Sequence, residues 1–102
     1  MSTAQALLDE LPSGPVVSLP EVRKLVGWTR REQSYAVTAG LIRPLPERAG
    51  YGGGYQVTRD DAVLILVAAA LALAAGVAIV VMIRAIRGAG LDPVALATSM
   101  QT

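Results

Sequence analysis

The feature that most constrains this chain is residues 62–83, a long stretch without any charged or strongly polar side chain. It exceeds the roughly 20 apolar residues that an α-helix needs to cross about 30 Å of hydrocarbon. A helix that is apolar on every side has to be surrounded. The rest of the chain has its own small core to form and is too short to wrap a helix of this length. We therefore expect one long apolar helix over residues 61–90, covered by something outside its own subunit.

Two environments would cover such a helix. In the first, the helices of two subunits pack against each other in a soluble homodimer. In the second, the helix crosses the cytoplasmic membrane once, and the four-residue spacing of small side chains provides a contact between membrane helices. We expect the contact, in either case, to involve Leu64, Ala68, Ala72, Gly76 and Ile79. We favour the homodimer and keep the membrane span as the alternative.

Composition excludes most catalytic chemistry. The 102 residues include no Cys and no His, so the chain has no disulfide, no thiolate or imidazole metal ligand and no imidazole general base. We expect no enzyme activity, no catalytic residues, no metal site and no cofactor. The net charge is only +1, from 9 basic and 8 acidic side chains, so any electrostatic function must depend on where the charges lie.

Two short capped helices are predicted in the polar half of the chain. Ser18 and Glu21 have the spacing of a capping box, and Gly27 would end the helix that follows. Thr29 and Glu32 repeat this spacing at the start of a second helix. Two capped helices joined by a tight turn are typical of a helix-turn-helix.

A hairpin is predicted after the second helix, which would end near Gly40. Residues 41–44 and 55–58 have extended character, and the segment between them is rich in proline and glycine, which exclude a helix and permit a turn. Such a hairpin is typical of a wing. The expected fold is mainly α: a winged helix-turn-helix with a short β-hairpin wing, followed by one long apolar helix. The expected parts are a flexible N-terminal segment (1–17), the winged helix-turn-helix domain (18–60), the apolar helix (61–90) and a C-terminal turn and tail (91–102).

Residues 27–44 read GWTRREQSYAVTAGLIRP and resemble the MerR-type winged helix-turn-helix. The positions that match the family's pattern without a gap are Gly27, Thr29, Arg31, Tyr35, Gly40, Leu41 and Pro44. Residues 54–61 are similar to the segment that closes the family's wing, and residues 82–91 to its later helix and turn. The resemblance implies double-stranded DNA as a partner, homodimerisation through a helix after the wing, and a cytoplasmic, nucleoid-associated location.

The departures from the family pattern restrict what the resemblance implies. Ser34 stands where the family usually has a second basic residue, and Ala36 where it has a second Tyr. The chain has no Cys for metal sensing, and we expect no effector domain after the helix. The resemblance thus implies a small transcriptional regulator or an excisionase-type factor that bends DNA. The alternatives are a membrane-anchored protein with a cytoplasmic helix-turn-helix-like interaction domain and a soluble dimer that binds no DNA.

The predicted DNA contacts follow from the placement of the basic residues, which strongly outnumber acidic ones between positions 23 and 43. A recognition helix presents its first turns to the major groove, where Arg bonds guanine and Gln or Ser reaches base edges. The expected base contacts are Arg30, Arg31, Gln33 and Ser34; the expected phosphate contacts are Arg23, Lys24, Tyr35 and Arg43; and the expected wing contacts are Arg48, Tyr51 and Gln56.

Overall fold

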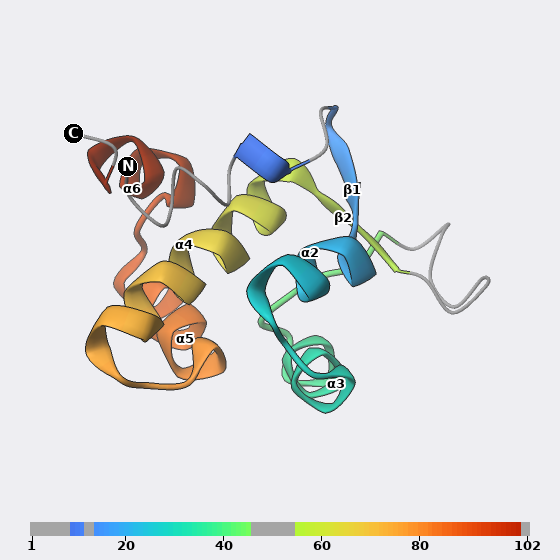
Figure 1. The fold of residues 1–102 in the computed structure, drawn as a ribbon, viewed down its shortest axis with the longest axis horizontal. Coiled ribbons are helices and arrows are strands. Elements are labelled where there is room, and N and C mark those ends of the chain that lie inside the picture. Colours follow the sequence, from blue (N-terminus) through green and yellow to red (C-terminus); the bar gives the residue numbers. More distant parts are fainter. Residues whose placement is uncertain (1–8, 12–13, 46–54, 101–102) are drawn as a thin grey trace.

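The computed structural model describes residues 9–11, 14–45 and 55–100. This part of the chain is mainly helical, with a small two-stranded antiparallel sheet (Figure 1). The elements in chain order are β1 (Val16–Ser18), α2 (Leu19–Val26), α3 (Arg30–Thr38), β2 (Gln56–Thr58), α4 (Arg59–Ala75), α5 (Ile79–Ala89) and α6 (Pro93–Met100).

The sheet pairs β2 with β1, and Val17 lies opposite Val57. Both of these valines are buried, as expected for β-branched side chains on the inner face of a sheet. The strand at 55–58 was expected to pair with residues 41–44, and residues 1–17 were expected to be a flexible segment. Instead, residues 16–18 provide the partner strand, and residues 43–45 are not part of a strand. The backbone N–H of Leu45 nevertheless donates to the carbonyl of Gln56 at 2.7 Å, so this segment passes beside β2. The predicted tip of the wing lies outside the described residues.

Helices α2 and α3 are joined by a short turn that begins at Gly27. This glycine has a φ of +71°, in the left-handed region, and ends α2 as predicted. The capping box at the start of α3 is also confirmed: the N–H of Glu32 donates to Thr29 Oγ1 at 3.1 Å, and the N–H of Thr29 donates to Glu32 Oε1 at 3.2 Å. Ser18 precedes α2 as predicted, but its side chain makes no capping hydrogen bond.

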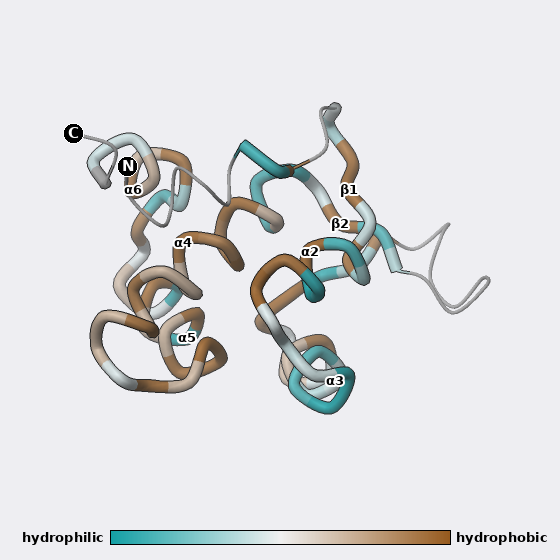
Figure 2. Tube along the Cα trace, in the orientation of Figure 1, coloured by the Kyte–Doolittle hydropathy of each residue, from teal (hydrophilic) through white to brown (hydrophobic). Residues whose placement is uncertain are grey.

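Helix α4 is the centre of the core. It crosses the middle of the molecule, with α5 and α6 on one side and α2 on the other (Figure 1), and it packs against all three. Every residue from 62 to 68 is buried, so this part of the helix is enclosed on all sides. Figure 2 shows the same helix as mostly hydrophobic along its length. Thr58 caps it by accepting a hydrogen bond from the N–H of Asp61 at 3.3 Å.

The single helix expected over residues 61–90 is two helices in the structure. Helix α4 ends at Ala75, Gly76 follows with a φ of +71°, and α5 begins at Ile79 at an angle of 113° to α4. The physical reason is that the bend lets α5 fold back against α4, which buries Ile83 and Ile86 within the same subunit. Glycine is the residue that adopts the left-handed conformation of this turn without a steric penalty.

The bend changes the expected subunit or membrane contact. Leu64, Ala68 and Ala72 are buried inside their own subunit, and Gly76 lies beyond the end of α4. The predicted stripe of small residues is therefore not a continuous helix face. Ile79 begins α5 and is half-buried. The folding of the chain on itself covers residues 62–68 and Ala72, whereas Leu73 and Val77 stay exposed.

Helix α6 replaces the short final turn of the expected C-terminal tail. The carboxylate of Asp92 accepts a hydrogen bond from the N–H of Val94 at 3.2 Å, at the first turn of this helix. Ala97 is buried in the core, and Leu96 packs against it. The region 91–102 thus contributes a helix that covers α4.

Candidate nucleic-acid interface

Helix α3 has one polar exposed face and one buried face. Its exposed residues follow helical spacing and are Arg30, Arg31, Ser34, Tyr35 and Thr38. Its buried residues are Gln33 and Ala36. The helix lies at the edge of the molecule (Figure 1), and Figure 2 shows its first turn as hydrophilic. A protruding helix with a basic, hydroxyl-bearing face has the shape and chemistry to enter a DNA groove.

The predicted base contacts are only partly on this face. Arg30, Arg31 and Ser34 are exposed together in the first turns of α3, but Gln33 is only 8% exposed. The structure therefore places Gln33 on the buried side of α3, away from the exposed face that the predicted base contact requires. Its position on the helix turns it inward beside Ala36, because residues three apart share a face. Among the described residues, Gln33 Oε1 has no hydrogen-bond partner.

The residues predicted to contact phosphates differ in solvent exposure and in the hydrogen bonds that they make within the protein. Lys24, Tyr35 and Arg43 are exposed. Arg23 is half-buried, and its Nη1 donates to the carbonyl of Trp28 at 3.3 Å, so it stabilises the turn between α2 and α3. Of the predicted wing contacts, Gln56 is half-buried in β2. Arg48 and Tyr51 lie outside the described residues.

One residue that the sequence interpretation missed adjoins the exposed face of α3. Arg84, on α5, donates from Nη2 to the hydroxyl of Tyr35 at 2.6 Å, and both side chains are exposed. The two residues are far apart in sequence, so no local pattern indicates that their side chains meet. The bend at Gly76 brings them together.

Arg87 connects α5 to the segment that directly follows α3. Its Nε donates to the carbonyl of Leu41, and its Nη2 lies 3.4 Å from Asp61 Oδ1 in the first turn of α4. The segment that it holds is attached to α3 by the N–H groups of Leu41 and Ile42, which both donate to the carbonyl of Ala36. Arg87 therefore joins α4, α5 and the end of α3.

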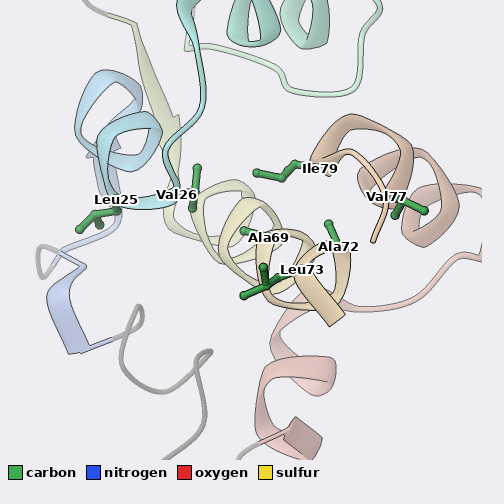
Figure 3. A pocket seen from close by; sticks show the side chains of 7 residues that line it. All are labelled: Leu25, Val26, Ala69, Ala72, Leu73, Val77 and Ile79. Atoms are coloured by element: carbon green, nitrogen blue, oxygen red, sulfur yellow. The ribbon is translucent and has the colours of Figure 1, made fainter. Parts of the chain in front are cut away.

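A second surface feature is an open apolar hollow of about 350 Å³ between α2 and the α4–α5 turn (Figure 3). Its lining is entirely hydrophobic and consists of Leu25, Val26, Ala69, Ala72, Leu73, Val77 and Ile79. Leu73 and Val77, which belong to this lining, are exposed, and so is Val81 in the first turn of α5. We call these three side chains the apolar rim. The described residues include no group of acidic or other ligating side chains that could hold a metal ion.

Comparisons with known proteins give no family for the chain. No protein-family model matches it, and neither curated proteins nor solved structures gave a significant match. Within the described ranges, no single helix has the length and apolar character needed to cross a membrane. Helices α4 and α5 meet that test of length and composition only when taken together as a bent pair.

Proposed function

We propose that the protein binds double-stranded DNA in a sequence-specific manner as a dimeric, MerR-like winged helix-turn-helix protein, acting as a transcriptional regulator or an excisionase-type accessory factor. The observation that carries this proposal is the exposed face of α3, where Arg30, Arg31 and Ser34 lie side by side at the start of a capped helix. The resemblance of residues 27–44 to the MerR family supports the same function.

In this proposal α3 is the recognition helix. Its N-terminal residues enter the major groove, where the guanidinium of Arg31 or Arg30 bonds a guanine edge bidentately and Ser34 bonds a neighbouring base. Lys24 and Arg43 flank the helix and contact phosphates, which position the protein without reading sequence.

The dimer contact is proposed at the apolar rim rather than along the buried part of α4 at residues 62–68. A helix-turn-helix protein gains site length by reading two half-sites with two subunits. Leu73, Val77 and Val81 are exposed and belong to residues 62–83, which include no charged side chain, so a second copy of the same surface is a suitable partner for them. Leu64 and Ala68 take no part in the contact because their own subunit buries them.

The test is a selection of bound duplexes from a random-sequence pool, followed by titration of the selected duplex. Arg31→Ala should lower the specific affinity by about 1–3 kcal/mol and relax the preference at one base position. Thr98→Ala, on α6, is the control and should leave the affinity unchanged, since its hydroxyl donates to the Val94 carbonyl on its own helix. Failure of the wild-type protein to enrich any sequence would contradict the proposal.

The membrane-anchored protein with an interaction domain remains the competing proposal, favoured only by the combined apolar character of α4 and α5. Expression without detergent separates the two. The DNA-binding dimer should stay in the supernatant and show twice the subunit mass by light scattering. Recovery only in a membrane pellet, released by detergent but not by salt, would instead support the anchor.

A further inference from the structure

We infer that Arg84 and Tyr35 together bind one phosphate of the DNA backbone, at the side of α3 that faces α5. This inference rests on the proposed function and adds to it a contact from an element outside the helix-turn-helix. The first observation is the 2.6 Å hydrogen bond from Arg84 Nη2 to the Tyr35 hydroxyl, between two exposed side chains on different helices.

The charge of Arg84 is available to a ligand. Within the described part of the chain, no carboxylate oxygen lies within 4.0 Å of its guanidinium. Arg87, one turn further along α5, differs because it is paired with Asp61. A guanidinium that has no carboxylate partner among the described residues, and that lies beside a hydroxyl, is a good partner for a phosphate, whose oxygens accept several hydrogen bonds at once.

The hydrogen bond from Arg84 also orients the Tyr35 hydroxyl to donate its proton to another acceptor. Its oxygen accepts from Arg84, so its own proton is left to be donated to another acceptor. Bonding to a cation polarises the hydroxyl and strengthens the bond that it donates. Arg84 keeps further N–H donors for the same acceptor. A phosphodiester offers two unesterified oxygens, one for each of these donors.

Tyr35 and Arg84 lie next to Arg31, the predicted base contact, which is where a phosphate contact is expected. Arg31 lies one turn before Tyr35 on the same face of α3, so Arg31, Tyr35 and Arg84 form a row that leads from the predicted base contact to α5. Arg87 holds α5 against the exit from α3. A contact placed this way fixes how α3 is oriented along the groove.

The experiment measures the affinity for a random-sequence 30-base-pair duplex as a function of salt concentration, because phosphate contacts do not depend on sequence. Arg84→Gln should weaken binding about tenfold at low salt and reduce the slope of log affinity against log salt by about 1. Tyr35→Phe should weaken binding several-fold without changing the slope, because it removes a hydroxyl and no charge. The double variant should lose less than the product of the two effects, since the groups act on one phosphate.

Arg59→Gln is the matched control for net charge. It removes one positive charge at the start of α4. The slope of log affinity against log salt should change less in this variant than in Arg84→Gln. Thermal unfolding of each variant by circular dichroism checks that the fold is retained. A wild-type protein that binds the duplex, together with an Arg84→Gln variant of unchanged affinity and slope, would overturn this inference and leave the proposed function intact.

Two further outcomes count against the inference. If the wild-type protein binds no duplex at low salt, the proposed function fails and this contact fails with it. Vesicles of anionic phospholipid, used as a second probe, test whether the pair recognises a lipid phosphate. Binding to such vesicles that depends on Arg84 and Tyr35, without binding to the duplex, would reject DNA as the ligand.

Discussion

Arg87 and Asp61 form an ion pair between the end of α5 and the start of α4, with 3.4 Å between Nη2 and Oδ1. The same arginine donates from Nε to the carbonyl of Leu41, just after α3. One side chain thus connects the core helix, the returning helix and the exit from the proposed recognition helix.

Loss of this connection should lower stability. We expect Arg87→Gln to reduce the free energy of unfolding by about 1 kcal/mol, because a partly exposed ion pair and one bond to a carbonyl are removed. Urea titration followed by circular dichroism measures the change. Arg84→Gln, on the same helix, should have almost no effect on stability. Equal losses in the two variants would show that Arg87 has no special structural role.

The turn between α4 and α5 depends on a left-handed residue. Gly76→Ala should destabilise the protein by about 1 kcal/mol, because its φ of +71° is unfavourable for alanine although a Cβ there would meet no atom within 4 Å. Gly88→Ala is the matched control: it lies inside α5 with the same open space, and alanine should stabilise the helix by about 0.5–1 kcal/mol. Thermal melts of both variants test for these opposite signs.

The two predicted capping boxes should respond differently to mutation. Thr29→Ala should cost about 1 kcal/mol, because the hydroxyl accepts a hydrogen bond from the N–H of Glu32. Ser18→Ala should change the unfolding free energy by less than about 0.5 kcal/mol, because its side chain makes no capping bond. Chemical denaturation of the two variants gives the comparison, and a larger loss for Ser18→Ala would contradict the described caps.

Two leucines on α4 provide a test of burial. Leu66 is 0% exposed and Leu73, two turns later, is 75% exposed. Leu66→Ala should destabilise the fold by about 2–5 kcal/mol, whereas Leu73→Ala should change it by less than about 0.5 kcal/mol. Unfolding should be measured on dilute protein, where association of subunits does not contribute. Similar effects at both positions would contradict the arrangement of α4 in the core.

The inward position of Gln33 has its own test. Gln33→Met keeps a similar shape and removes the carbonyl oxygen that has no hydrogen-bond partner among the described residues, so stability should be unchanged or higher by up to about 1 kcal/mol. The affinity for the selected duplex should be unchanged as well. A change in base preference in this variant would restore Gln33 as a DNA contact.

The caps and ends of the helices were predictable from the sequence, and the one predicted cap that does not form is explained by tertiary contacts. The caps and ends of α2 and α3 depend on residues within a few positions, so Thr29, Glu32 and Gly27 were placed correctly. Ser18 has the same motif, but it belongs to β1 and pairs with Gln56, a residue far along the chain. A local motif does not reveal that a distant strand determines the conformation of its first residue.

The apolar stretch at residues 62–83 shows a second limit of prediction from the sequence. A helix that is hydrophobic on all sides has no periodicity to indicate what covers it. The bend at Gly76, and the cover that α5 provides, depend on contacts between distant residues. The candidate site shares this limit. The exposure of Arg30 and Arg31 follows from their position in the first turn of α3, whereas the burial of Gln33 and the approach of Arg84 to Tyr35 depend on how distant helices pack.

The pairing of β1 with β2 has a consequence for how the chain folds. Val17 and Val57 are about 40 positions apart, so the sheet closes a long loop that contains both α2 and α3. Local helices form in about a microsecond, but this closure must wait for the two ends of the loop to meet. We therefore expect folding to be limited by the docking of the N-terminal strand, and the proposed recognition helix to acquire its final orientation only at that late step.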